Sequence, residues 1–126
     1  MKKEMVFSPN APKPVGAYNH GVICQGILYT AGQIALDPVT NELVKGGAKE
    51  EATQIMKNLG SILEAAGTNY DNLLKATIYL TDLNDFATVD QVYKEFVTKN
   101  PPGRTCVEVT AIPKGGKVEM EMIACI

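Results

Sequence analysis

The sequence predicts an α+β fold in which two helices cover one face of a sheet and the other face packs against further copies of the chain. The order of the predicted elements is two strands, a helix, a strand, a second helix and two strands, and two helices can cover only one face of such a sheet. The segments 21–24, 76–80 and 121–126 are apolar on both of their faces. Monomers avoid an uncovered apolar face of this size, so we expect a homo-oligomer.

The N-terminal part of the chain predicts a loop and two short strands. Residues 8–16 are rich in proline, which cannot donate to a central strand ladder and therefore fits a loop or an edge segment. Residues 21–36 are typical of two strands joined by a turn at Gln25 and Gly26.

The clearest helix is predicted over residues 48–67. Apolar residues recur there at spacings of three and four, which gives one apolar stripe. Glu50 and Glu51 fall in the early turns, where negative charge favours the helix dipole, and Gly67 is a natural C-terminal stop.

A long strand and a second helix follow. The strand is expected over residues 72–82 and the helix over residues 84–97, with Asn84 as its N-cap. The helix carries an apolar side made of Phe86, Val89, Tyr93, Phe96 and Val97. We expect this side to face the sheet.

Length and composition indicate one domain of ordinary make-up. The chain has 126 residues, of which 45% are apolar and 21% charged, and the expected domain spans residues 1–126. A net charge of −2 and a pI of about 5.4 give no electrostatic reason to bind nucleic acid or an anionic membrane. The three cysteines form no CxxC pair, and no apolar run has the length of a membrane span. We therefore expect a reduced, cytoplasmic protein.

Several kinds of catalytic site are excluded by what the sequence lacks. His20 is the one histidine, so a Ser-His-Asp or Cys-His arrangement would have to include it, and a structural or exposed role fits it better. No cluster has metal-ligand spacing, and neither the GxxxxGK[ST] nor the GxGxxG pattern occurs. We expect no metal and no cofactor.

The C-terminal segments predict a hairpin that concentrates polar groups. Residues 103–112 and 117–126 are expected to pair across the turn at 113–116. Alternation along the strands would place an arginine, a thiol and three carboxylates on one face: Arg104, Cys106, Glu108, Glu119 and Glu121. A solvated face, or ion pairs between subunits, is the alternative to a functional site.

Arg104 is the chain's only arginine among twelve basic residues. Its planar fork of donors matches a carboxylate or phosphate at two points, which lysine cannot do. In the predicted hairpin, Arg104 and Glu119 would lie at opposite ends, roughly 20 Å apart. If both serve one site, we expect that site to lie between subunits.

The motifs together resemble the RidA family, also called the YjgF or reactive-intermediate deaminase family. The matching segments run nearly end to end: VGAYNHGV, YTAGQIALDP, NLGSILEAAG, TIYLTDLNDFATVDQVY and PPGRTCVEV followed by IPKGGKVEMEMIA. The resemblance implies a chorismate-mutase-like α+β fold and a homotrimer. In such a trimer, three sheets form a central β-barrel and the sites lie in the clefts between chains.

The resemblance also implies an activity: hydrolysis of 2-iminobutanoate, 2-iminopropanoate and their enamine tautomers, formed by pyridoxal-phosphate enzymes, to 2-oxo acids and ammonia. On the matching positions, Arg104 would hold the substrate carboxylate and Glu119 would position and activate water. Cys106 would contribute mainly through its backbone. Tyr18 and Gly32 would line the pocket, and Phe86 would form an apolar wall.

Three positions depart from the family's usual pattern. Gly103 stands where the family commonly has alanine, and Thr105 where serine is common. Asp90 occupies a position often filled by asparagine, and would add negative charge if it reached the pocket. Two other functions stay open: an endoribonuclease, as attributed to some members, and a non-catalytic binder of 2-oxo acids.

Overall fold

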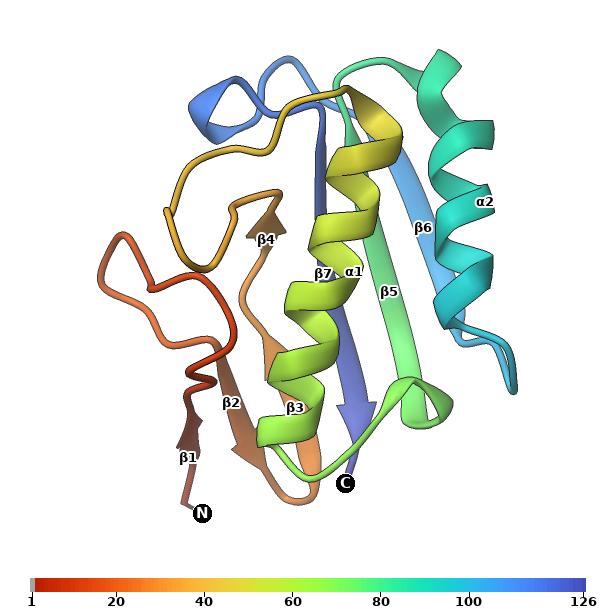
Figure 1. Ribbon diagram of the computed structural model, residues 1–126. Coiled ribbons are helices and arrows are strands. Elements are labelled where there is room, and N and C mark those ends of the chain that lie inside the picture. Colours follow the sequence, from red (N-terminus) through yellow and green to blue (C-terminus); the bar gives the residue numbers. More distant parts are fainter. Residues whose placement is uncertain (1) are drawn as a thin grey trace.

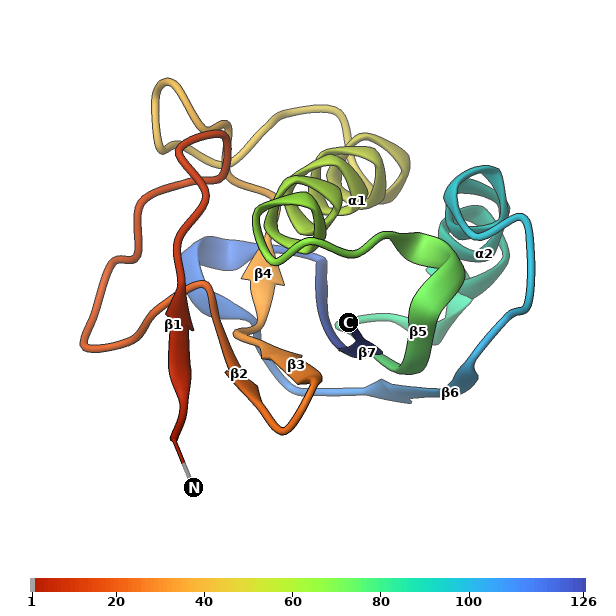
Figure 2. The same cartoon turned by 90° about the horizontal axis from the view of Figure 1, so that it is seen from below.

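Two helices lie side by side on one face of a mixed sheet, as the computed structural model of residues 2–126 shows (Figure 1). The helices are α1 (Ala48–Ala65) and α2 (Phe86–Phe96). The strands are β1 (Glu4–Val6), β2 (Gly21–Cys24), β3 (Ile27–Thr30), β4 (Gln33–Ile34), β5 (Leu73–Leu80), β6 (Gly103–Glu108) and β7 (Val118–Cys125). Seen from below, both helices occupy the same side of the curved sheet (Figure 2). The predicted α+β class and one-sided helix layer are confirmed.

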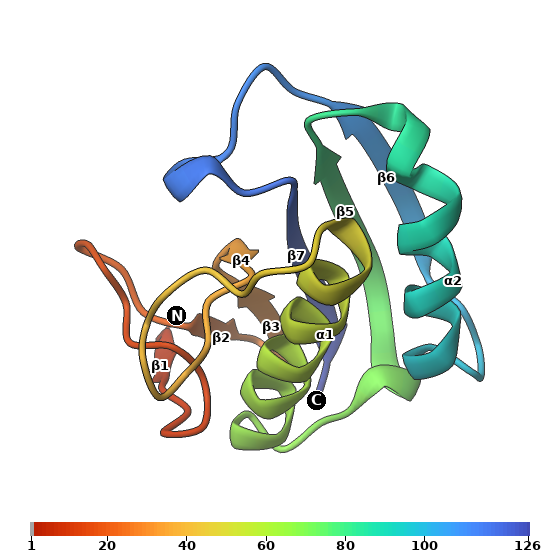
Figure 3. The ribbon, with the colours of Figure 1, turned by 45° about the horizontal axis from the view of Figure 1, so that its top comes forward.

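The sheet order is β1-β2-β3-β7-β5-β6, with β4 also paired to β7. The predicted hairpin of β6 and β7 is therefore wrong, because β5 lies between them. β5 lies between β6 and β7 (Figure 3), pairing with β6 in parallel and with β7 antiparallel. A parallel pair needs a crossover connection, which α2 supplies, and β7 then returns along the other side of β5. Sequence adjacency suggested a hairpin, whereas burial of the apolar β5 and β7 places both in the centre.

The hairpin of β2 and β3 is confirmed, with its turn at the predicted residues. Gln25 and Gly26 both have positive φ, at 52° and 75°, as a two-residue type I′ turn requires. The sequence did not indicate β1, which pairs with β2 at the sheet edge. The proline-rich segment forms the loop between β1 and β2 (Figure 1).

Helix α1 buries the predicted stripe. Its fully buried apolar residues are Ala52, Ile55, Met56, Leu59, Ile62 and Leu63, and burying each large side chain contributes about 1.5–3 kcal/mol. The predicted stop is also confirmed. Gly67 has φ of 83° and donates its N–H to the carbonyl of Glu64, while the Thr68 N–H reaches the carbonyl of Leu63.

The start of α2 differs from the prediction. A short 3-10 turn, Leu83–Asp85, precedes the helix, and Asn84 lies inside it. The capping side chain is that of Asp82, whose carboxylate accepts the Asn84 N–H at 2.9 Å. Both residue types cap well, and the extra 3-10 turn moves the cap two positions earlier.

The sheet face away from the helices is partly apolar. Strand pairing sets Met5 beside Val22, Val22 beside Tyr29, and Tyr29 beside Ile123 on this open face. Met5 and Tyr29 are each about half exposed. The structure thus confirms an uncovered apolar surface on β1, β2, β3 and the end of β7. On β5 the prediction is wrong, because its open face carries Thr77 and Tyr79 beside Glu121 and Glu119. Neither helix within residues 2–126 is long and apolar enough to cross a membrane.

A buried carboxylate joins α1 to the start of β7. Glu51 is 3% exposed, and its Oε1 accepts the N–H of Lys117 at 2.8 Å and of Val118 at 3.3 Å. Both donors directly precede Glu119 in the chain. Hydrogen bonds to a charged group are stronger than neutral ones, so Glu51 fixes the backbone from which Glu119 projects.

Replacing Glu51 with alanine should lower the free energy of unfolding by about 2 kcal/mol, because two backbone donors lose their acceptor. Urea denaturation measures this loss. Glu50→Ala, one position earlier in the same turn, should cost less than about 1 kcal/mol, since it removes only a charge near the helix N-terminus. Equal losses for both variants would contradict the anchoring role of Glu51.

Candidate active site

The structure divides the six predicted site residues into two groups of three. One group contains Tyr18, Gly32 and Glu119, which line a common pocket. The other contains Phe86, Arg104 and Cys106, which lie where β6 meets α2.

The two groups lie on opposite faces of the sheet, so the prediction that Arg104 and Glu119 share a face is wrong. Arg104 pairs with Ala76 and points toward α2, whereas Glu119 pairs with Tyr79 and points to the open face. In a direct hairpin of β6 and β7 the two side chains would share a face; because β5 lies between these strands, they point to opposite faces. Strand spacings put the two Cα atoms roughly 14 Å apart, with the side chains diverging.

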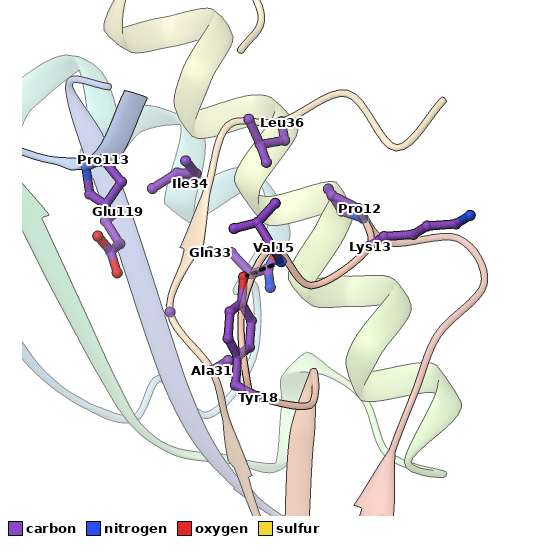
Figure 4. Close-up of a pocket in the computed structure, with 11 residues that line it drawn as sticks. Pro12, Lys13, Val15, Tyr18, Ala31, Gln33, Ile34, Leu36, Pro113 and Glu119 are labelled. Carbon is purple, nitrogen blue, oxygen red and sulfur yellow. Dashed lines mark hydrogen bonds between the residues drawn. The ribbon is translucent and has the colours of Figure 1, made fainter. Parts of the chain in front are cut away.

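We call the first group's cavity the Glu119 pocket, which encloses about 280 Å³. It is lined by Pro12, Lys13, Val15, Tyr18, Ala31, Gly32, Gln33, Ile34, Leu36, Pro113 and Glu119. Figure 4 shows the Glu119 carboxylate on β7 and the Tyr18 ring on the loop before β2, both lining it. Its walls are largely apolar, so an ionised group inside it is poorly solvated.

Because Gly32 has no side chain, the Glu119 carboxylate can occupy the space beside it. A Cβ built on Gly32 would overlap Glu119 Oε2, far inside van der Waals contact. Burial raises the pKa of Glu119 above its ordinary value of 4.5, and the nearby Glu121 raises it further. Glu121 is itself held by the Tyr79 hydroxyl, whose pKa this hydrogen bond raises to about 12. The result is a carboxylate with increased affinity for a proton.

His20 has a structural role, which is one of the two roles that the sequence left open. It is fully buried, its Nδ1 accepts the Ser8 N–H at 2.9 Å, and its Nε2 lies 2.7 Å from the Pro12 carbonyl. These partners require a neutral ring with the proton on Nε2. The bonds fix the loop that carries Tyr18, whose hydroxyl accepts the Val15 N–H at 3.2 Å (Figure 4).

We call the second group, with two further neighbours, the Arg104 cluster: Phe86, Asp90, Tyr93, Arg104 and Cys106. The guanidinium carbon lies 4.8 Å from the Tyr93 ring centroid and 5.4 Å from that of Phe86. Arginine stacks favourably on aromatic faces. The two rings hold the guanidinium against α2 while its side chain stays 25% exposed.

Asp90 reaches Arg104 directly. Its Oδ1 accepts a hydrogen bond from Arg104 Nη1 at 2.6 Å, and its Oδ2 lies 3.2 Å from Lys94 Nζ. The bond from Arg104 holds the pKa of Asp90 below the ordinary value of 3.8 against the opposing effect of burial, and Lys94 adds to the lowering. From the sequence, Asp90 stands out only as a departure from the family pattern, and Tyr93 only as part of the apolar side of its helix. The spacing of Phe86, Asp90 and Tyr93, at four and three residues, is the helical signal that groups them.

Within this cluster, Cys106 is a neutral thiol. Burial raises its pKa, the positive Arg104 opposes this, and Asp90 adds to it. A raised pKa leaves little thiolate at neutral pH, which is the nucleophilic form. Among residues 2–126, no group of three or more histidines, cysteines and carboxylates is placed to hold a metal ion.

Comparison with known proteins identifies the class. A family model described as Endoribonuclease L-PSP matches residues 8–126. The structure of RidA from the Antarctic bacterium Psychrobacter superposes with a TM-score of 0.94 at 38% identity, covering 98% of this chain and 99% of that one. The chain belongs to this family, RidA or YjgF, as its motifs suggested.

Three further relatives agree with this family assignment. The rat 2-iminobutanoate/2-iminopropanoate deaminase is 43% identical over 97% of this chain and 89% of its own length. A RutC family protein of Pyrococcus horikoshii is 44% identical over 97% of both chains. The structure of E. coli TdcF with bound serine matches with a TM-score of 0.93 at 36% identity and covers 98% of both chains.

Replacing Gly32 with alanine should displace the Glu119 carboxylate from its pocket, because the new methyl group occupies the position of Oε2. A crystal structure of the variant measures the displacement. Gly103→Ala is the matched control, since a Cβ there meets nothing closer than 3.9 Å. A Glu119 that keeps its place in Gly32→Ala would contradict the proposed packing.

The Asp90–Arg104 pair should make stability depend on pH. Because the folded pKa of Asp90 is lowered, its contribution is complete above the unfolded value of 3.8 and disappears as pH falls through the folded value. The excess stability of wild type over Asp90→Asn should therefore be constant near neutrality and shrink below about pH 4. Urea unfolding across pH measures it, with Glu95→Gln on the same helix as control. A difference unchanged down to the most acidic condition would contradict this.

Proposed function

We propose that this protein hydrolyses 2-imino acids such as 2-iminobutanoate and 2-iminopropanoate to 2-oxo acids and ammonia, in clefts between the subunits of a homotrimer. One observation carries the proposal: the chain has two separate half-sites, the Arg104 cluster and the Glu119 pocket. The first holds a stacked, partly exposed guanidinium and the second a carboxylate of raised pKa. The deaminase names of relatives such as the rat protein support the same activity.

The separation of the half-sites supports assembly into a ring. β6, which carries Arg104, ends the sheet on one side, while the Glu119 pocket lies toward the β1–β2 side. A contact that joins these different surfaces is head-to-tail, and such contacts form closed rings when the rotation permits. In the proposed homotrimer, Arg104 of one subunit faces the Glu119 pocket of the next. The apolar open faces meet inside, as a central barrel requires.

Arg104 has the properties of a carboxylate holder. Its partly exposed guanidinium can bind both oxygens of a substrate carboxylate, and the rings of Tyr93 and Phe86 already restrict its orientation. A fixed carboxylate fixes the adjacent imine carbon, and such positioning accounts for much of enzymatic rate enhancement. The serine bound to E. coli TdcF is also a small molecule with one carboxylate.

Glu119 has the properties of the proton carrier. Water attacks the imine carbon while Glu119 takes a proton from the water and passes it to the imine nitrogen, which gives a carbinolamine. Glu119 then takes the hydroxyl proton of the carbinolamine and delivers it to the amine, so the C–N bond breaks, ammonia leaves and the 2-oxo acid forms. A carboxylate of raised pKa suits both steps, and such help is worth roughly 10² to 10⁴ in rate. Cys106 stays a thiol and takes no covalent part.

An endoribonuclease is the second candidate, because the matching family model carries that description. The chain's charge of −2 and its single arginine provide little for phosphate contacts. A binder of 2-oxo acids without turnover is the third candidate. A coupled assay separates the deaminase from the other two: with threonine dehydratase and threonine, the deaminase speeds the appearance of 2-oxobutanoate, whereas the other two do not.

Replacing Arg104 with lysine should remove most of this acceleration, because a point charge does not reproduce the fork. The coupled assay measures the loss, and circular dichroism checks that the variant folds. Lys99→Arg serves as a control for the exchange itself. Turnover of 2-iminobutanoate near the wild-type rate in Arg104→Lys would refute the role of Arg104.

Replacing Glu119 with glutamine should slow hydrolysis about 10²-fold or more while binding of a 2-oxo acid persists, since the change removes the proton carrier alone. Calorimetric titration with 2-oxobutanoate measures binding and the coupled assay measures hydrolysis. Glu121→Gln is the matched neighbour and should retain more activity. If Glu119→Gln hydrolyses the imine at the wild-type rate, Glu119 has no part in the chemistry.

A further inference from the structure

We propose that Asp90 makes the Arg104 half-site selective for ligands that carry a positive nitrogen next to their carboxylate, such as iminium acids and α-amino acids, over plain carboxylates. The selectivity would favour the protonated imino acid over the 2-oxo acid that replaces it. The inference deepens the proposed function and rests on Arg104 as the carboxylate holder.

The first support is the geometry of the pair. Arg104 Nη1 and Asp90 Oδ1 lie 2.6 Å apart, so a positive and a negative group stand side by side at the surface of one cavity. That cavity encloses about 480 Å³ and is lined by Asp90, Arg104, Tyr93 and Lys94 among others. A ligand with adjacent charges of opposite sign matches this arrangement, carboxylate to Arg104 and nitrogen to Asp90.

The second support is the charge balance. A plain carboxylate on Arg104 would stand within a few ångström of the Asp90 carboxylate, and like charges at that distance repel. Asp90 also occupies one of the guanidinium donors, so the ligand competes with it for Arg104. A positively charged nitrogen converts this repulsion into attraction.

The third support is that one of the two partners of Asp90 is weakly held. Its partner Lys94 is 68% exposed, and the contact is an i,i+4 pair on the surface of α2. Such exposed pairs are weak. A ligand nitrogen can therefore take the place of Lys94 at Oδ2 while Arg104 stays at Oδ1.

The test compares two ligands of the same carbon skeleton, L-alanine and pyruvate, by NMR titration of the full-length protein. The wild type should favour alanine, and Asp90→Asn should shift the ratio of dissociation constants about tenfold toward pyruvate. Asparagine is nearly isosteric, so the variant isolates the charge. Glu95→Gln, which makes the same charge change at an exposed position of α2, should leave the ratio unchanged.

Each outcome bears on one proposal or both. A ratio that Asp90→Asn leaves unchanged, or an equal shift in Glu95→Gln, overturns the selectivity of Asp90 even if the protein hydrolyses imines. The expected shift, found in a protein that does not speed 2-oxobutanoate formation, upholds the selectivity and overturns the deaminase. Binding of neither ligand by the wild type overturns the selectivity.

Discussion

The central constraint on this protein is that β5 separates Arg104 from Glu119. Because β5 pairs in parallel with β6 and antiparallel with β7, the two charged side chains leave the sheet on opposite faces. No rotamer change in one chain can bring them to one small ligand, since the sheet itself lies between them. Any chemistry that uses both must involve a second chain. In the proposed deaminase, the fold therefore makes activity depend on assembly.

Each half-site is prepared by contacts within its own chain. On one side, Gly32 and the buried His20 loop shape an apolar pocket around Glu119, and Glu51 anchors the backbone that precedes it. On the other side, α2 presents a carboxylate and aromatic rings to Arg104. Both groups are thus oriented before a ligand arrives. Such preorganisation reduces the cost of ordering when the ligand binds.

Local signals carried most of what could be predicted. The apolar period of α1, the turn at Gln25 and Gly26, and the end at Gly67 depend on residues close together in the chain, and all are confirmed. The pairing of β7 was missed because it depends on which distant strand buries its apolar faces. Family motifs supplied the six candidate site residues. Their division between two faces follows from the strand order, which no motif gives. The sequence shows that Asp90 stands where the family often has asparagine, but only the fold shows that it contacts Arg104.

The shared site can be tested by mixing two inactive variants. Arg104→Lys keeps an intact Glu119, and Glu119→Gln keeps an intact Arg104. Subunits of both are unfolded together in equal amounts, refolded, and checked for mixed oligomers by native mass spectrometry. If the site lies between chains of a ring, random mixing pairs both intact residues at about a quarter of the interfaces, and the mixture should regain about that share of wild-type hydrolysis. Mixed oligomers as inactive as the two parent variants would contradict a site shared between subunits.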